Sequence, residues 1–181
     1  MSDPPDVDAL KAEIARLKRR VAELELLADR DPLTPLLNRR AFLRELLRAQ
    51  AFQARYGGEW ALAFLDLDGL KHINDTHGHA AGDAALQAVA QTLIDHVRET
   101  DVVGRIGGDE FAVLLSHAAP EAARVKAADL VAQIAAEPLV FEGKSIPLSA
   151  SVGVQAVEKG VSPPELIAAA DAAMYLNKRG R

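Results

Sequence analysis

Two clusters of carboxylates are the residues whose types and spacing favour chemistry. Asp66 and Asp68 end an apolar segment, and Asp109 and Glu110 follow two consecutive glycines. Strand residues two apart point to the same face, so Asp66 and Asp68 can share one side, with a neighbouring hairpin bringing Asp109 alongside. Either cluster alone is compatible with a solvated strand end or a glycine turn that needs positive φ. Their coincidence favours a site for Mg²⁺, which prefers hard oxygen ligands.

The elements that must position these acids alternate between helices and strands. Residues 60–68 form a nearly continuous apolar run, which is typical of a strand buried on both faces. Helices are predicted over residues 38–55, 80–97, 120–136 and 163–175, a hairpin over 101–106 and 111–116, and a further strand over 148–157. This order predicts an α/β sandwich with a mixed central sheet and a tight hairpin at its centre.

The N-terminal segment predicts a coiled-coil helix. Apolar residues recur at alternating spacings of three and four. β-branched residues or alanine occupy the a positions of the heptad, and leucines occupy the d positions. This combination favours a parallel homodimer, and flanking charges would form attractive pairs between partners. The alternative is a single amphipathic helix that packs on its own domain. The seam consists of Val7, Leu10, Ile14, Leu17, Val21, Leu24 and Ala28.

Composition restricts the class of protein. With 21 Lys+Arg against 26 Asp+Glu, the formal net charge of −5 argues against nucleic acid or an anionic membrane as the main partner. The absence of cysteine excludes disulfides, thiolate zinc sites and cysteine nucleophiles. The first residues lack the layout of a signal peptide, and the longest apolar run, 60–65, is too short to cross a bilayer. We therefore expect a cytoplasmic protein.

The segment from Arg105 to Phe111, which reads Arg-Ile-Gly-Gly-Asp-Glu-Phe, resembles the signature of the GGDEF family of diguanylate cyclases. Further motifs agree in order and spacing, at residues 31–40, 66–75, 78–83 and 170–175. The resemblance covers roughly residues 29–181. It implies a nucleotidyl-cyclase or palm-like sandwich preceded by the coiled-coil helix, with residues 1–29 as the dimerisation helix and 30–181 as the cyclase domain.

The resemblance also implies a reaction and roles for the acids. Two GTP molecules would condense to cyclic di-GMP with release of two pyrophosphates, in a dimer that holds one GTP per subunit. Asp66, Asp109 and the backbone carbonyl of Leu67 would hold two Mg²⁺ ions per half-site, with Mn²⁺ as the alternative. Glu110 would lie near the attacking 3′-hydroxyl as a candidate general base. Lys71 would assist catalysis and contact phosphate.

Substrate contacts follow from the same resemblance. Asn74 and Asp83 match guanine-reading positions, and a carboxylate can accept hydrogen bonds from guanine N1 and N2, which adenine does not offer. Backbone amides near Gly69 and Leu70, together with Lys71 and Lys178, would hold the phosphates. Leu70 stands where the family usually has Phe. The tail is one residue shorter than usual, which leaves a phosphate contact by Arg181 open.

A four-residue pattern upstream of the signature predicts regulation. Arg98 and Asp101 form an R-x-x-D pattern that resembles the family's product-inhibition site for cyclic di-GMP. The alternative is a surface arginine and an aspartate at a strand start. An upstream sensor domain or a partner would act through residues 29–34. Competing hypotheses for the whole chain are a catalytically silent module that binds GTP or cyclic di-GMP, a dimerisation protein with a structural globular part, and a cyclase with another product.

Overall fold

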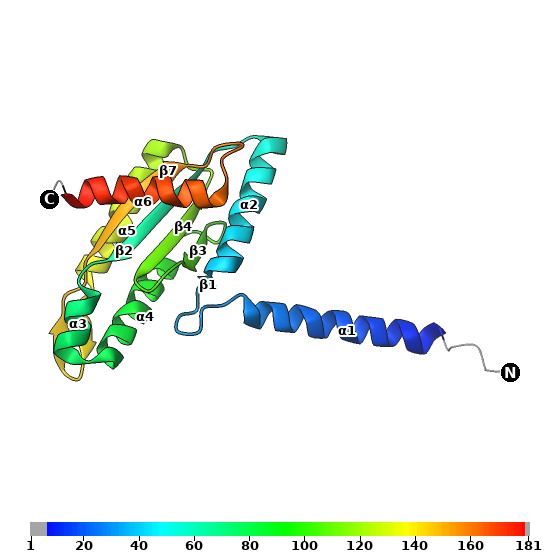
Figure 1. The fold of residues 1–181 in the computed structure, drawn as a ribbon, viewed down its shortest axis with the longest axis horizontal. Helices are drawn as coiled ribbons and strands as arrows, with labels where there is room; N and C mark the ends of the chain where they lie inside the picture. Colours follow the sequence, from blue (N-terminus) through cyan, green and yellow to red (C-terminus); the bar gives the residue numbers. More distant parts are fainter. Residues whose placement is uncertain (1–6, 180–181) are drawn as a thin grey trace.

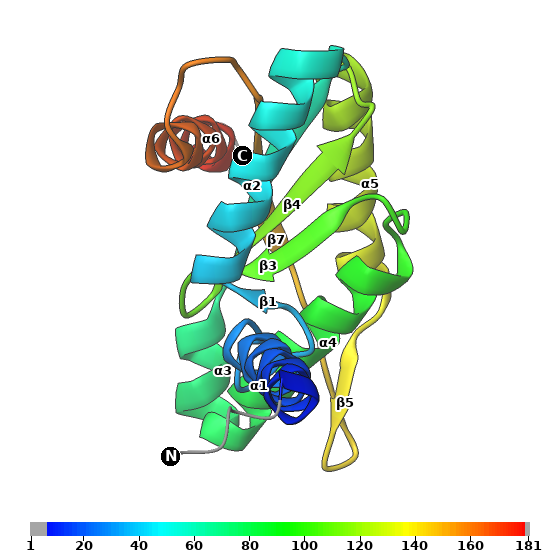
Figure 2. The ribbon, with the colours of Figure 1, turned by 90° about the vertical axis from the view of Figure 1, so that its right-hand side faces the viewer.

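A mixed five-stranded sheet forms the body of the protein, with helices on both of its faces (Figures 1 and 2). The computed structural model describes residues 7–179. The strand order is β1-β3-β4-β2-β7, in which β1 and β3 are parallel and the other neighbours are antiparallel. The mixed α/β architecture predicted from the sequence is confirmed. The strands are β1 (Leu37–Asn38), β2 (Trp60–Leu67), β3 (Val102–Arg105), β4 (Glu110–Ser116) and β7 (Ala150–Ala156).

The helices follow the sequence expectation closely, with one addition. The last helix continues past residue 175 to Arg179, and the predicted helix over 80–97 begins at His79. The sequence did not predict α3, β1 or a small hairpin of β5 and β6, because each is too short to show a periodic pattern. The helices are α1 (Val7–Ala28), α2 (Arg39–Tyr56), α3 (Leu70–His77), α4 (His79–Asp95), α5 (Pro120–Ala136) and α6 (Pro163–Arg179), and the hairpin strands are β5 (Leu139–Phe141) and β6 (Lys144–Ile146).

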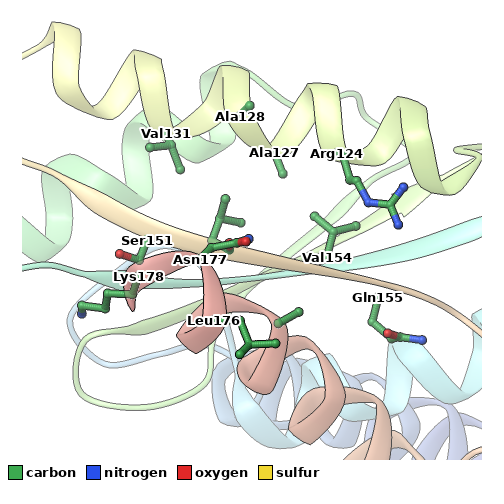
Figure 3. A pocket seen from close by; sticks show the side chains of 12 residues that line it. Arg124, Ala127, Ala128, Val131, Ser151, Val154, Gln155, Leu176, Asn177 and Lys178 are labelled. Carbon is green, nitrogen blue, oxygen red and sulfur yellow. The ribbon is translucent and has the colours of Figure 1, made fainter. Parts of the chain in front are cut away.

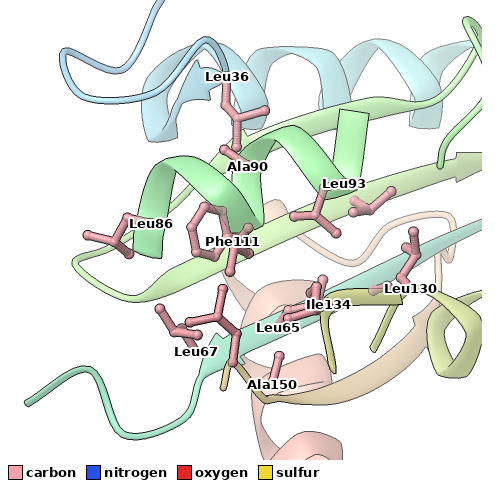
Figure 4. Packing of buried hydrophobic residues seen from close by; sticks show 14 of the residues in the cluster. Leu36, Leu65, Leu67, Leu86, Ala90, Leu93, Phe111, Leu130, Ile134 and Ala150 are labelled. Carbon is pink, nitrogen blue, oxygen red and sulfur yellow. The ribbon is translucent and has the colours of Figure 1, made fainter. Parts of the chain in front are cut away.

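Alternate residues of β2 enter two hydrophobic clusters, one on each face of the sheet. Leu65 and Leu67 pack into the cluster that contains residues of α4 and α5, as Figure 4 shows. Leu62 and Phe64 pack into the other cluster, with residues of α2 and α6. Because strand side chains alternate, Asp66 continues the series of Leu62 and Phe64. The apolar pattern of β2 therefore directs the Asp66 carboxylate to the face covered by α2 and α6.

Helix α1 extends away from the sheet (Figures 1 and 2). Its seam residues Leu10, Ile14 and Leu17 are 51%, 52% and 49% exposed. These exposures contradict a helix packed on its own domain and leave an apolar stripe uncovered, whereas the side chains of Val7, Val21 and Leu24 lie outside the described residues, as does Arg181. Within residues 7–179, no helix combines the length and apolar character needed to cross a bilayer.

The end of α1 is fixed to the first turns of α2. The last carbonyl of α1, that of Ala28, accepts hydrogen bonds from Asn38 Nδ2 at 2.7 Å and Arg40 Nη2 at 3.1 Å. Asp29 is 8% exposed and forms ion pairs with Arg40 and Arg44. Arginine pairs lower the pKa of Asp29, with the Arg44 hydrogen bond as the largest cause. The orientation of α1 is therefore tied to the globular domain by side chains rather than by a free linker.

Candidate active site

The two carboxylate clusters meet where β2 ends and β4 begins. Asp66 lies directly opposite Glu110 in the antiparallel ladder. The backbone N–H of Leu67 donates to the carbonyl of Asp109 at 3.0 Å. Cross-strand partners point to the same face of a sheet, so Asp66 and Glu110 share the side covered by α2 and α6. The prediction that a hairpin brings the second cluster beside the first is confirmed by this register.

Lys178, on the last turns of α6, lies between the acids of the first cluster. Its Nζ is 2.7 Å from an oxygen of Asp66 and 2.7 Å from an oxygen of Asp68. Ser151 Oγ also donates to Asp68, at 3.1 Å. The hydrogen bonds to Asp66 and Asp68 raise the pKa of Lys178 well above its ordinary value, so it stays cationic. The sequence predicted a phosphate contact for Lys178, and the structure places it on carboxylates.

The donor set around Asp66 fits a hard cation. Two carboxylates, of Asp66 and Asp109, and the carbonyl of Leu67 belong to neighbouring backbone positions, and Asp66 already attracts one cation, the ammonium of Lys178. Among the side chains that the structure describes, no group of three or more His, Asp or Glu forms a metal site by itself. Mg²⁺ is commonly held by one or two carboxylates while phosphates and water fill its other positions. These protein oxygens alone would not complete the coordination of Mg²⁺, and the phosphates of a ligand would supply the missing oxygens.

Glu110 sits in a crowded, acidic part of the site. Its pKa is raised, first by burial and then by the charges of Asp109, Asp171 and Asp66, while Arg39 opposes the shift. Asp171, on α6, and Arg39, on α2, lie within motifs at residues 170–175 and 31–40, but no role was predicted for either. Their effect on Glu110 depends on how these helices pack on the sheet, which the motifs themselves do not indicate.

The first glycine of the signature lies close to the Glu110 side chain and does not have positive φ. Among the described residues with positive φ, neither Gly107 nor Gly108 appears. The alternative interpretation of the pair, a glycine turn that needs positive φ, is therefore excluded. A Cβ on Gly107 would lie 2.0 Å from Oε2 of Glu110. Gly107 thus lets the turn lie against the Glu110 carboxylate.

The predicted guanine-reading residues lie together on α3 and α4. Gly78 separates the two helices, and Asn74 of α3 packs on Gly82 of α4, where a Cβ would lie 1.9 Å from Asn74 Oδ1. Asp83, the next residue, is exposed. Lys71 is also exposed, in the first turn of α3. Asn74 therefore lies against the residue that precedes Asp83.

Gly69 and Leu70 are at the start of α3. Gly69 caps the helix without a side-chain hydrogen bond, and Leu70 is its first residue. The first amides of a helix have no intrahelical acceptor, and they point toward whatever lies beyond the N-terminus. The predicted phosphate-binding amides therefore lie directly after β2 and its carboxylates.

A partly buried ion pair connects the segment after α1 to the turn of the signature. Asp31 Oδ1 accepts hydrogen bonds from Arg105 Nη1 at 3.1 Å and from the Thr34 backbone N–H and hydroxyl at 2.9 Å each. Arg105 Nη2 also donates to the carbonyl of Gly108 at 2.7 Å. Both charged side chains are 13% exposed. The residues between stalk and domain are thereby joined to the turn that carries Asp109 and Glu110.

Replacing Asp31 by asparagine is expected to reduce the free energy of unfolding by about 1–3 kcal/mol at pH 7. Burial alone would raise the pKa of Asp31, but hydrogen bonds from Thr34 and Arg105 outweigh it and lower that pKa from 3.8. A lowered carboxyl pKa stabilises the fold above the unfolded value and loses this effect as pH falls through the folded value. The difference between parent and variant should therefore shrink below about pH 4.

Urea unfolding at pH 7 and pH 3 measures this difference. Glu121→Gln is a matched control, since Glu121 pairs with Arg124 but its side chain is 81% exposed, and it should change stability little at either pH. A difference for Asp31→Asn that stays constant over this pH range would contradict the role of its charge.

The predicted inhibitory residues lie at the other end of β4. The Arg98 backbone N–H donates to Asp101 Oδ2 at 3.0 Å, and Asp101 Oδ1 accepts from the Ser116 backbone N–H at 2.9 Å. Arg98 is exposed, whereas Asp101 is partly buried. Asp101 therefore has a structural role in fixing the loop before β3, while it also lines a small pocket with Arg98.

A groove of about 740 Å³ runs along β7 between α5 and α6 (Figure 3). Ser151 and Lys178 lie at one end of its lining, and Arg124 lies on α5 toward the other (Figure 3). None of Asp66, Asp109 and Glu110 lines it. The groove therefore touches the carboxylate site only through Ser151 and Lys178, and the reactive acids lie outside it.

Comparison with known proteins agrees with this arrangement. Residues 28–181 match the family described as "Diguanylate cyclase, GGDEF domain". Diguanylate cyclase TpbB of Pseudomonas aeruginosa is 38% identical over 96% of this chain, and diguanylate cyclase DgcP of the same species is 41% identical over 82%. The chain spans only 40% and 22% of the lengths of these two curated relatives.

A solved structure resembles both parts of the molecule. It contains the coiled coil and GGDEF domain of DgcB from Caulobacter crescentus in complex with c-di-GMP, and it superposes with a TM-score of 0.84 at 30% identity. The match covers 96% of this chain and 93% of that one. With a family match over all but its first residues and relatives of this similarity, the chain belongs to the GGDEF-domain family of diguanylate cyclases.

Proposed function

We propose that this chain condenses two GTP molecules into cyclic di-GMP and releases two pyrophosphates. The convergence of Asp66, Leu67, Asp109 and Glu110 at adjacent strand ends carries the proposal. In each half-reaction, the 3′-hydroxyl of one GTP would form a bond to the α-phosphorus of the other, the bond to pyrophosphate would break, and Glu110 would take the hydroxyl proton.

The residues divide this task between holding a metal and positioning the nucleotide. Asp66, Asp109 and the Leu67 carbonyl would hold Mg²⁺, two ions per half-site or Mn²⁺ in their place, and the ions would polarise the α-phosphate and the nucleophile when bound. The amides at Gly69 and Leu70 and the ammonium groups of Lys71 and Lys178 would hold the phosphates. For this role Lys178 would exchange a carboxylate contact for a phosphate contact.

The symmetry of the product requires two domains, because each would hold one GTP. The uncovered stripe of α1, with Leu10, Ile14 and Leu17 about half exposed, supports a parallel coiled-coil homodimer. Residues 1–29 would be the dimerisation helix and 30–181 the cyclase domain. An upstream sensor would act through residues 29–34, which the ion pairs of Asp29 and Asp31 connect to the domain. An enzyme that consumes GTP in this way would work in the cytoplasm.

Replacing Asp83 by serine is expected to lower kcat/KM for GTP by about ten- to a hundredfold and to narrow the preference for GTP over ATP. The carboxylate accepts from guanine N1 and N2, and serine removes this charged acceptor without adding bulk. Competition between GTP and ATP for the purified chain measures the preference. Asp75→Ser, an exposed aspartate on α3, is the matched control. An unchanged preference in Asp83→Ser would contradict the assignment.

Incubation of the purified chain with GTP and Mg²⁺ tests the activity itself. The chain is first stripped of bound nucleotide, and the products are separated by chromatography. Formation of cyclic di-GMP and pyrophosphate in a 1:2 ratio is expected. Binding of GTP without turnover would instead favour a silent module, and absence of any nucleotide-induced rise in Tm would favour a structural role.

Product inhibition at Arg98 and Asp101 completes the proposal. The DgcB structure, whose domain resembles this one, contains c-di-GMP. An arginine fork beside a carboxylate suits the donors and acceptors of a guanine edge. Accumulated cyclic di-GMP should therefore slow the reaction.

A further inference from the structure

The pocket beside Arg98 is lined by a second cation and an aromatic ring in addition to the two residues of the R-x-x-D pattern. Its volume is about 100 Å³, and residues at the end of β4 and at the start of α5 line it. Figure 2 shows the chain turning from the end of β4 toward α5. Glu110 and Ser116 are the first and last residues of β4, so the pocket is about 20 Å from the catalytic carboxylates along the strand. The lining is Arg98, Asp101, Leu115, Ser116, His117, Ala118, Ala122 and Lys126.

The charges of this pocket favour an anion although the whole chain is acidic. Arg98 and Lys126 line it, and Asp101 is its single carboxylate. Both oxygens of Asp101 already accept hydrogen bonds from the backbone amides of Arg98 and Ser116. Lys126 pairs with Asp129 at 2.9 Å, but its side chain remains 33% exposed. Two cations on a chain of net charge −5 form a local site for a phosphorylated ligand.

His117 adds an aromatic surface in an unusual backbone conformation. Its φ is +48°, a left-handed value that is uncommon for residues other than glycine. The neighbouring Ala118 N–H donates to the carbonyl of Glu59 at 3.0 Å, which helps to hold the turn. The ring centroid of His117 is 6.3 Å from that of Trp60, with 34° between the planes. Strained residues of this kind concentrate at ligand sites.

We infer that Lys126 and His117 are further parts of the product-binding surface. Lys126 contacts a phosphodiester of cyclic di-GMP, and the His117 ring stacks on a guanine base whose edge is read by Arg98 and Asp101. The pocket is small, so it admits one end of the dinucleotide while the remainder lies over His117. This inference rests on the proposed product inhibition and adds two residues to it.

Binding of cyclic di-GMP to the stripped chain tests the inference. Lys126→Met should weaken binding about tenfold, and His117→Gly, which fits the left-handed backbone, about fivefold. Lys126→Arg should restore most of the affinity. Initial rates without product should match the parent, because both residues are remote from the carboxylates. Trp60 is the only tryptophan, so its fluorescence should change on binding in the parent and change less in His117→Gly.

Two controls distinguish this inference from the proposal of product inhibition at Arg98 and Asp101. Lys144→Met removes an equal charge from the exposed β5–β6 hairpin and should leave affinity unchanged. If Arg98→Ala weakens binding while Lys126→Met and His117→Gly bind as the parent does, the extension is wrong and the R-x-x-D site stands. If Arg98→Ala itself binds and is inhibited like the parent, both are wrong.

Discussion

Replacing Glu110 by glutamine is expected to reduce the rate of cyclic di-GMP formation by about 10²–10⁴-fold while GTP affinity changes little. Glutamine keeps the shape of the side chain that lies against Gly107, but it cannot take a proton from the 3′-hydroxyl. Single-turnover measurements with saturating GTP and Mg²⁺ separate this chemical step from binding and product release.

Stability provides a second signature of the same change. Burial and the charges of Asp109, Asp171 and Asp66 raise the pKa of Glu110, so the fold disfavours its ionised form. The neutral glutamine should therefore leave Tm equal to or above that of the parent. If Glu110 serves catalysis at the expense of stability, its replacement lowers turnover without lowering Tm. If it were needed only for folding, its replacement would lower Tm.

Glu137→Gln is the matched control for Glu110→Gln. Glu137 is exposed at the end of α5, remote from the signature turn in the chain, and its replacement should preserve both turnover and Tm. Parent-like turnover in Glu110→Gln would show that a group other than Glu110 removes the proton. A loss of turnover accompanied by a lower Tm would assign Glu110 a structural role instead.

The position of the acids could be predicted because strand patterns are local. The apolar run of β2 predicted a strand buried on both faces, and the spacing of Asp66 and Asp68 predicted a shared face. The first prediction depends on a continuous apolar run and the second on the two-residue period of a strand. The burial of β2 confirms the first, and the contacts of Lys178 with both Asp66 and Asp68 agree with the second.

The surroundings of the acids could not be predicted in the same way, because they come from distant segments. Lys178 contacts Asp66 across 112 sequence positions, and Asp171 and Arg39 affect Glu110 from different helices. Whether such side chains converge depends on how helices pack on the sheet, which no local pattern determines. Lys178 is one example: the sequence predicted a contact with phosphate, whereas the structure shows contacts with the carboxylates of Asp66 and Asp68.

Short elements and tight turns were the other source of error. Helix α3 has eight residues and β1 has two, so neither shows a repeating pattern. A turn that needs positive φ was only the alternative interpretation of the two glycines of the signature, and neither of them has positive φ. The close approach of the Glu110 carboxylate to Gly107 is visible only once the hairpin is folded.

Replacing Ile14 and Leu17 together by glutamine is expected to reduce specific activity by about 10²-fold or more at low micromolar protein. The tether gives each domain an effective concentration on the order of millimolar near its partner, and without it two half-sites must meet by diffusion. Both residues are about half exposed on α1, so the change should not unfold the domain. Glutamine also preserves helix propensity.

The dependence on protein concentration decides whether α1 acts as a dimerisation stalk. Activity of the variant should recover as its concentration rises, and sedimentation velocity should show a monomer where the parent is a dimer. Ala12→Gln/Arg19→Gln carries the same number of glutamines at the outward heptad position and should behave as the parent. If the seam variant keeps the activity of the parent at every concentration, the half-sites meet without the stalk. If the variant is monomeric and its activity stays low at every concentration, α1 must do more than raise the frequency of encounter: the ion pairs of Asp29 with Arg40 and Arg44 would then set the orientation of the two domains.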